Sequence, residues 1–246
     1  MSVGSLSFDP IADRYDATRG GEPRGRFLAD LVLPWLPADG LVAEIGVGTA
    51  VVASALAARG TAVAGFDLSG RMLDVASGRF GGPLVLADVA ELPVRAGSLA
   101  AAYAVWVLHL VDDVGAVVAE CRRALRPGGR FVAVVDDAAR RVGAPELLEL
   151  EDRYRRRADR LPHLDPIVRA AGFEPVAVKD LAAFRRPTSR AELADHLEKR
   201  TWSWLWTVPT DRWGDEVVPV IAALRASEDP TPIDHQVANQ LVVWER

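Results

Sequence analysis

The stretch LVAEIGVGTAVVASALAARG, residues 41–60, joins an apolar run to an alanine-rich segment through two glycines. Gly46 and Gly48 permit positive φ angles and let a ligand approach the backbone closely. A glycine turn between a strand and a helix is typical of sites for nucleotide-like ligands, because the helix N-terminus presents N–H groups without intrahelical partners. The stretch therefore predicts an α/β domain with a ligand at this turn.

The spacing of the glycines argues against a dinucleotide. A dinucleotide-binding turn needs a third glycine where this chain has Val51. A β-branched side chain there would push the helix away from the strand. The turn fits a different pattern better, in which an acid, two glycines and a small residue alternate with other residues. In this chain they are Glu44, Gly46, Gly48 and Ala50. Such a turn suits a nucleoside with a charged tail, with Glu44 meeting an ammonium group or a bridging water.

Short apolar runs alternate with helix-like segments from residue 41 to about residue 136. Runs without strict alternation indicate strands that are buried on both faces of a parallel sheet. We therefore expect a doubly wound α/β fold. The expected strands are 41–46, 62–67, 84–87, 100–106 and 130–136, and the expected helices are 50–59, 70–79 and 113–126.

Beyond residue 137 the pattern becomes less regular. A charged helix is expected over 144–161, followed by a further helix, a glycine stop and a sixth strand. The last residues predict a seventh strand, so that the mostly parallel sheet has seven. We predict one domain, 1–246, with an N-terminal helical cover (1–35), a cofactor-binding core (40–137), a helix and sixth strand (138–184), a helical cap insertion (185–235) and a last strand (236–246).

Acidic residues follow the second and third predicted strands. Asp67 could accept hydrogen bonds from both hydroxyls of a ribose, and Asp88 could accept one from the exocyclic amine of adenine. An open α/β sheet binds its ligand at the carboxyl ends of its strands. Met72 could pack its thioether against the adenine. The alternative for both aspartates is that they cap a helix.

Composition excludes several classes of protein. The net charge of −5 disfavours a broad electrostatic grip on nucleic acid or on anionic membrane. The single cysteine, Cys121, excludes an intrachain disulfide and a thiolate metal cage, and no metal-ligand cluster is visible. The N-terminus does not read as a signal peptide, and no apolar run is long enough to cross a bilayer. We therefore expect a cytoplasmic protein.

Five segments together resemble one family, the class I S-adenosylmethionine-dependent methyltransferases of small molecules, in particular those of ubiquinone and menaquinone biosynthesis. They are AEIGVGTA (43–50), GFDLS (65–69), LADVAELP (86–93), YAVWVLHLVDD (103–113) and ECRRALRPGGRFVAVV (120–135). FDPIADRYDATRG (8–20) resembles the N-terminal helix of the family. Two departures are Ala50, where glycine is frequent, and Ala100–Ala102, where the family often has an acid.

The resemblance implies a Rossmann-like methyltransferase fold, S-adenosyl-L-methionine as the cofactor and a role for each matching residue. Glu44 and the two glycines would line the methionine part, Asp67 would bind the ribose, and Val105 would offer its backbone to the amino group. Tyr15 and Arg19 would close over the cofactor. The implied cofactor-binding residues are Tyr15, Arg19, Glu44, Gly46, Gly48, Asp67, Leu68, Met72, Asp88, Val89 and Val105.

The residues that would act on the acceptor are less specific. His109 follows the fourth strand and could act as a general base, although histidine is common there without that duty; His196 is a second candidate. In RTWSWLWTVP (200–209), tryptophans could form an aromatic wall for a flat acceptor, or could simply pack a core. The candidate substrate-binding residues are Trp106, Arg200, Trp202 and Trp206.

These observations predict an enzyme that transfers a methyl group to oxygen, nitrogen or carbon of a small organic molecule, chiefly by proximity and in-line alignment. The expected partner is that small molecule, not nucleic acid or membrane, and the expected state is a monomer or homodimer. Two alternatives stay open. The chain could bind the cofactor without methyl transfer, or use the fold to rearrange a metabolite. A nicotinamide-dependent oxidoreductase is disfavoured by Val51.

Overall fold

A computed structural model describes residues 8–137, 143–181, 187–233 and 238–246. The chain forms two compact units. We call Met1–Val135, Ala158–Asp180 and Gln240–Arg246 the sheet unit, and Asp136–Arg157 and Leu181–Asn239 the helical unit. The predicted boundaries at 138, 184, 185, 235 and 236 fall outside the described residues.

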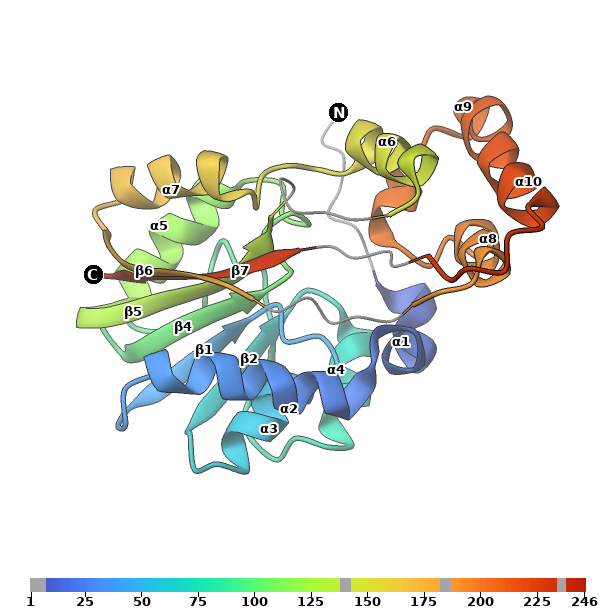
Figure 1. The fold of residues 1–246 in the computed structure, drawn as a ribbon. Coiled ribbons are helices and arrows are strands. Elements are labelled where there is room, and N and C mark those ends of the chain that lie inside the picture. The colour runs from blue at the N-terminus through green and yellow to red at the C-terminus, as the bar shows by residue number, and fades with distance from the viewer. Residues whose placement is uncertain (1–7, 138–142, 182–186, 234–237) are drawn as a thin grey trace. The chain divides into compact units, whose positions relative to one another are not determined.

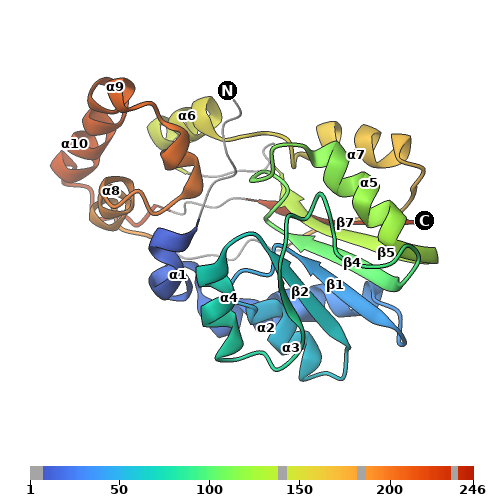
Figure 2. The same cartoon turned by 180° about the vertical axis from the view of Figure 1, so that it is seen from behind.

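The sheet has seven strands in the order β3-β2-β1-β4-β5-β7-β6 (Figures 1 and 2). Neighbours from β3 to β5 pair in parallel, whereas β6 pairs antiparallel with β7. The predicted mostly parallel, doubly wound sheet is confirmed. The strands are β1 (Leu41–Ile45), β2 (Val63–Asp67), β3 (Leu84–Leu86), β4 (Leu99–Val105), β5 (Leu125–Asp136), β6 (Glu174–Asp180) and β7 (Asn239–Glu245).

One strand differs from the prediction in its start. β5 begins at Leu125, although RPGG was expected to separate a helix from a strand at residue 130. Leu125 pairs with Leu99, and the ladder resumes after a register shift at Ala101 and Arg130. Gly128 lies between them with φ +72°, which allows the chain to bulge out and return to the sheet.

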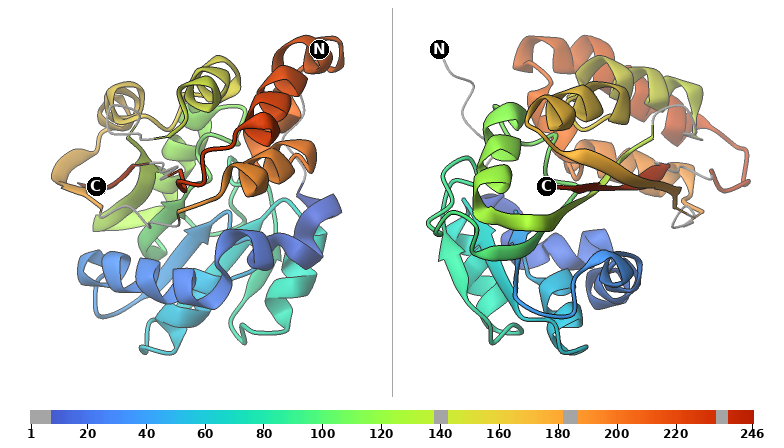
Figure 3. Two further views of the ribbon diagram at one scale, coloured as in Figure 1. Left: turned by 45° about the vertical axis from the view of Figure 1, so that its right-hand side comes forward. Right: turned by 90° about the vertical axis from the view of Figure 1, so that its left-hand side faces the viewer.

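Helices cover both faces of this sheet. α2 packs against α3 on one face, and α5 packs against α7 on the other (Figures 1 and 3). The close packing of α2 on α3 needs Gly25, because a Cβ there would lie 2.4 Å from the Val51 oxygen. The helices of the sheet unit are η1 (Asp9–Ile11), α1 (Ala12–Arg19), α2 (Gly21–Val32), η2 (Leu33–Trp35), α3 (Val51–Ala57), α4 (Gly70–Ser77), α5 (Val114–Ala124) and α7 (Leu161–Ala170).

The helical unit has a core of its own, in which leucines of α6 and α8 pack with Trp204, Leu205 and Ile221. The helix predicted over 144–161 is wrong beyond Tyr154. The backbone of Arg155 is extended, and its guanidinium bonds back to the buried Glu151 at 2.8 Å. The helices are α6 (Pro145–Tyr154), α8 (Arg190–Glu198), η4 (Ser203–Thr207), α9 (Thr210–Arg212), the π-helical η5 (Trp213–Val217) and α10 (Val218–Ala226).

Within the described ranges, no helix has the length and apolar character that crossing a membrane would require.

Candidate functional site

A cavity of about 250 Å³ lies where β1, β2 and β4 end, and the described residues that line it belong to the sheet unit. Most of the predicted site residues meet there: Tyr15, Gly46, Gly48, Asp67, Leu68, Met72, Asp88, Val89, Val105 and Trp106. The lining residues that sequence reasoning missed are Phe8, Ala90, Val107, Leu110, Val111, Asp112, Asp113 and Val117. Several follow β4 within YAVWVLHLVDD, so that motif carried a signal for them.

The glycine turn after β1 forms one wall of the cavity. Gly46 has φ +68° and Gly48 has φ +53°. A Cβ at position 46 would lie 2.3 Å from Cγ2 of Val107, whereas one at position 48 meets no atom within 4 Å. Ala50 also adopts a positive φ, +58°, which costs a residue with a Cβ about 1–2 kcal/mol. The turn therefore keeps the positive φ angles that favour glycine as far as Ala50, its last residue.

Asp67 ties this turn to the end of β2. Its Oδ2 accepts a hydrogen bond from the Gly48 N–H at 2.7 Å, and its Oδ1 accepts one from the Ser69 N–H at 2.9 Å. Burial raises the pKa of the Asp67 carboxyl, and these two donors offset part of that effect. The alternative that Asp67 caps α4 is wrong, since Ser69 is the N-cap and its hydroxyl accepts from the Met72 N–H.

The cavity is acidic. Four aspartates line it, and no lysine or arginine occurs among its lining residues in the described part of the chain. Asp88 accepts a hydrogen bond from the Ala90 N–H at 2.9 Å, and Asp113 caps α5 by accepting from the Ala116 N–H at 3.0 Å. Clefts lined by one sign of charge concentrate ligands of the opposite sign. The cavity therefore favours a ligand that carries positive charge.

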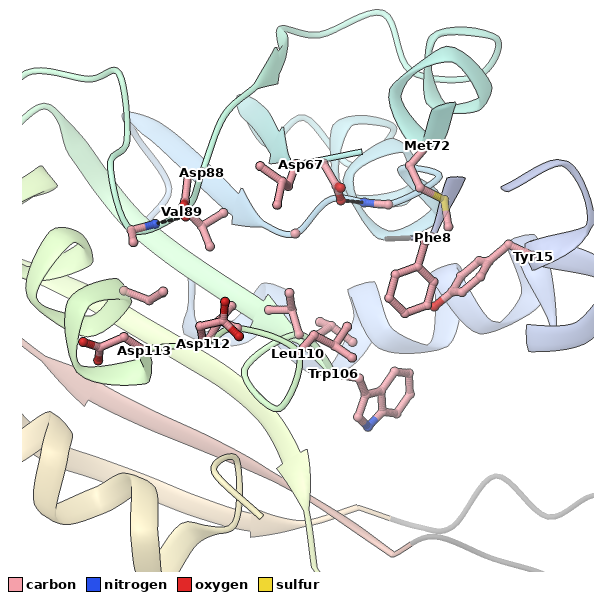
Figure 4. Close-up of a pocket in the computed structure, with 18 residues that line it drawn as sticks. Phe8, Tyr15, Asp67, Met72, Asp88, Val89, Trp106, Leu110, Asp112 and Asp113 are labelled. Carbon is pink, nitrogen blue, oxygen red and sulfur yellow. Dashed lines mark hydrogen bonds between the residues drawn. The ribbon is translucent and has the colours of Figure 1, made fainter. Parts of the chain in front are cut away.

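The side chains at the cavity form two groups, with Asp67 between them (Figure 4). Phe8 and Tyr15, whose rings meet edge to face at 5.8 Å, lie near Met72 in one group. Asp88, Asp112 and Asp113 lie together with Val89 in the other group (Figure 4). An elongated ligand that passes Asp67 and reaches both groups fits this arrangement.

Two aspartates of α1 hold this helix beside the cavity. Asp16 accepts a hydrogen bond from the Thr49 hydroxyl and pairs with Arg79, both at 2.6 Å. Asp13 pairs with Arg71 at 3.1 Å. These contacts join α1 to the glycine turn and to α4, and they place Tyr15 at the cavity.

Glu44 and Arg19 are not among the lining residues. Glu44 lies in β1, 3% exposed, and its Oε2 accepts a hydrogen bond from the Tyr103 hydroxyl at 2.7 Å. Burial raises the pKa of the Glu44 carboxyl to about 8, with hydrogen bonds from Tyr103 and from the Ala53 N–H opposing the rise. Glu44 thus links β1, β4 and α3. The Arg19 guanidinium lies 5.8 Å from the centre of the Tyr15 ring.

Glu44 predicts a pH dependence of stability. The native carboxyl keeps its proton up to about pH 8, whereas the unfolded one loses it near pH 4.3. Between these values the native state holds the extra proton, so the contribution of Glu44 to stability is lost as the pH rises through this window. Urea unfolding at pH 6 and pH 9 should show a larger loss for the wild type than for Glu44→Gln. Equal losses in the two proteins would contradict a protonated Glu44.

His109 lies just before the lining residues Leu110 and Val111 but does not line the cavity itself. Its Nδ1 is 3.2 Å from Oδ2 of Asp159, which is buried. The carboxylate can fix the ring orientation and the tautomer, as carboxylates paired with histidine do. No sequence pattern connects these two residues, which lie far apart along the chain.

The remaining predicted residues belong to the helical unit. The rings of His196 and Trp202 lie 5.3 Å apart, and Trp202 stacks on Trp204 at 6.0 Å. Arg200 lies 3.9 Å above the Trp213 ring, and its carbonyl accepts from the indole N–H of Trp206 at 2.8 Å. Within this stretch, Ser203–Thr207 form the 3-10 helix η4. Trp204 is buried, while Trp202 and Trp206 are partly buried against the same core.

No group of three or more histidine, cysteine, aspartate or glutamate side chains suited to a metal ion occurs in the described part of either unit.

The family described as "Methyltransferase domain" matches residues 43–133, which run from β1 into β5. These residues are a methyltransferase domain. The resemblance to class I S-adenosylmethionine-dependent methyltransferases is confirmed, and the methyltransferase domain contains the glycine turn, Asp67 and Asp88.

Curated methyltransferases match part of this chain. The ubiquinone/menaquinone biosynthesis C-methyltransferase of Desulfotalea psychrophila is 35% identical over 138 residues, 52% of this chain and 55% of the relative. The demethylmenaquinone methyltransferase of Tropheryma whipplei is 33% identical over 107 residues, 42% of this chain and 45% of the relative. The matches thus span about half the length of these relatives.

Solved structures share the fold over nearly the whole chain. A possible histamine N-methyltransferase from Thermotoga maritima has a TM-score of 0.57 at 18% identity, covering 97% of this chain and 95% of its own. The [4+2]-cyclase SpnF has a TM-score of 0.63 at 18% identity, covering 97% and 93%. At these identities the likeness establishes the fold.

Proposed function

We propose that the protein is an S-adenosylmethionine-dependent methyltransferase that transfers a methyl group to oxygen, nitrogen or carbon of a small organic acceptor. The observation that carries the proposal is the acidic cavity at the strand ends, where Asp67 is anchored beside the glycine turn. The methyltransferase domain and the names of the curated relatives, which are methyltransferases of small molecules, support it.

The residues fit the cofactor. Asp67 would accept hydrogen bonds from the ribose hydroxyls, and Leu68 follows it in the lining. Asp88 would accept from the adenine amine, with Val89 beside it, and Met72 would pack on the ring. Gly46, Gly48 and Val105 would offer backbone to the methionine part, over which Tyr15 closes. The aspartates favour the positively charged sulfonium form over its neutral product.

When bound, the cofactor supplies a methyl group that is already activated by the sulfonium. The task of the protein is then to align the acceptor and to exclude water, and such positioning alone provides about 7–11 kcal/mol of barrier lowering. Where the acceptor must lose a proton, we propose that His109 takes it, with Asp159 holding the ring. His196 in the helical unit is a second proton acceptor to test.

For the acceptor we propose Trp106, which lines the cavity of the sheet unit, as a contact. Arg200, Trp202 and Trp206 of the helical unit are separate candidates, each to be tested by substitution. Once an acceptor is found by screening, His109→Ala should lower kcat about 100- to 10,000-fold if that acceptor loses a proton in the transition state. His163→Ala provides a control for losing a histidine on α7. Unchanged turnover in a Trp202→Ala, Trp206→Ala double variant would end the proposal of an aromatic wall.

Calorimetric titration tests the proposed function. S-adenosylmethionine and S-adenosylhomocysteine should bind with micromolar affinity, and NADH should not bind. Binding of NADH alone would instead support an oxidoreductase. Binding by none of the three would remove the proposal.

A second candidate function is the rearrangement of a metabolite by a cofactor-bound protein of this fold, without methyl transfer. The likeness to a structure named as a [4+2]-cyclase favours keeping it. The two are separated by incubating the protein with methyl-labelled cofactor and candidate acceptors. Label in the product supports transfer, whereas a rearranged, unlabelled product supports the alternative.

A further inference from the structure

Arg24 on α2 has an environment that the proposed function does not use. Its guanidinium carbon lies 3.9 Å from the centre of the Trp106 ring, in a stacking position. Its Nη1 donates a hydrogen bond to the Arg19 carbonyl at 3.0 Å. Among the described residues, no carboxylate lies within ion-pairing distance of it. A half-buried guanidinium is therefore balanced by a ring face, a carbonyl oxygen and a hydrogen bond with the Tyr15 side chain, and by no described carboxylate in contact with it.

The charges around Arg24 make this arrangement costly. Burial lowers the pKa of Arg24, and the nearby positive charge of Arg19 lowers it further, while the hydrogen bond with Tyr15 and the negative charge of Asp16 act in the opposite direction. A desolvated cation that lacks a close counter-charge is unfavourable, and a second cation nearby adds to the cost. An anion bound here would remove that cost.

The surroundings place this cation beside the cavity. Tyr15 and Trp106, the two aromatic neighbours of Arg24, both line it. Trp106 holds a positive φ of +51°, a strained conformation for a large side chain, and such strain gathers at functional sites. Arg24 is not itself a lining residue, but its contacts with Tyr15 and Trp106 put a positive charge next to a lining whose four aspartates would repel an anion.

We propose that Arg24, stacked on Trp106 and next to Tyr15, binds a carboxylate at this edge of the cavity. The planar guanidinium matches a carboxylate with two parallel hydrogen bonds. This inference rests on the proposed function, and the carboxylate has two possible sources. It is either the amino-acid tail of the cofactor or a carboxylate of the acceptor.

The test compares Arg24→Gln with Arg26→Gln, a control on the same helix whose exposed guanidinium pairs with Glu22. Each variant is titrated with S-adenosylhomocysteine and with 5′-methylthioadenosine, which lacks the amino-acid tail. If Arg24 binds the tail, Arg24→Gln lowers the affinity for S-adenosylhomocysteine at least 10-fold and leaves the affinity for 5′-methylthioadenosine unchanged. Arg26→Gln changes neither affinity. Arg24→Lys keeps the charge but loses the planar fork, and it should give an intermediate loss.

A second arm detects an acceptor carboxylate. 4-Fluorobenzoate is titrated into the protein saturated with S-adenosylhomocysteine and followed by fluorine NMR. Loss of its binding in Arg24→Gln, with nucleoside affinity unchanged, assigns the site to the acceptor. If Arg24→Gln changes neither the affinity for S-adenosylhomocysteine nor the binding of 4-fluorobenzoate, the inference is overturned.

A folding control and the behaviour of the wild type separate failure of this inference from failure of the proposed function. Native-like melting of each variant is required, and Arg24→Lys replaces Arg24→Gln if the latter does not fold. If the wild type binds neither nucleoside, the proposed function fails, and 4-fluorobenzoate binding to the wild type and the variant then decides on Arg24 by itself.

Discussion

Asp67→Ala is expected to weaken the binding of S-adenosylhomocysteine about 5- to 150-fold, corresponding to about 1–3 kcal/mol for a buried partner that is lost. The carboxylate has two roles that the substitution removes together. It would accept from the ribose hydroxyls, and it already accepts from the backbone of Gly48 and Ser69, which shapes the wall of the cavity. Calorimetry on the purified variant measures the change.

The matched control for Asp67→Ala is Asp74→Ala on α4, which removes an exposed carboxylate whose pairing with Arg71 at 3.5 Å is surface-exposed. It should leave affinity unchanged. Since 5′-methylthioadenosine retains the ribose, Asp67→Ala should weaken it as much as it weakens S-adenosylhomocysteine, in contrast to Arg24→Gln. Unchanged affinity for both nucleosides in a folded Asp67→Ala protein would refute the ribose assignment.

The sequence predicted the sheet well because its signals are local. Apolar runs bounded by glycine or by an aspartate marked β1, β2 and β3 to within about two residues, a precision near the limit of any boundary assignment. The start of β5 was missed because a bulge at Gly128 lets a strand continue through a sequence that reads as a break. Whether the chain bulges or turns there depends on pairing with β4, which no local pattern contains.

The lining residues Asp67, Asp88 and Val105 were predicted because they lie at or just after the carboxyl ends of strands, and parallel strands bring these ends to one edge of the sheet. Glu44 was predicted at the ligand because it precedes the glycines. The structure instead directs its carboxyl to Tyr103, a partner on another strand. Stacking of Arg24 on Trp106 likewise joins a helix to a distant strand end. Contacts of this kind depend on tertiary packing, which single-sequence periodicity does not encode.

Gly46→Ala is expected to destabilise the protein by about 2–5 kcal/mol. The backbone there has φ +68°, which costs a residue with a Cβ about 1–2 kcal/mol. The new methyl group would also lie 2.3 Å from Cγ2 of Val107, and forced overpacking of this kind adds about 1–3 kcal/mol. Urea unfolding gives the free energy of unfolding of wild type and variant.

Gly48→Ala separates these two contributions, because position 48 shares the positive φ but has open space around its Cβ. Its free energy of unfolding should fall only by the backbone contribution, about 1–2 kcal/mol. Its binding of S-adenosylhomocysteine should nevertheless weaken, because residue 48 lines the cavity. Combining Gly46→Ala with Val107→Ala removes the clash and should restore part of the loss, since the two residues are in contact and their effects are coupled. If the double variant is less stable than the sum of its single variants predicts, steric conflict with Val107 is not what makes glycine necessary at position 46.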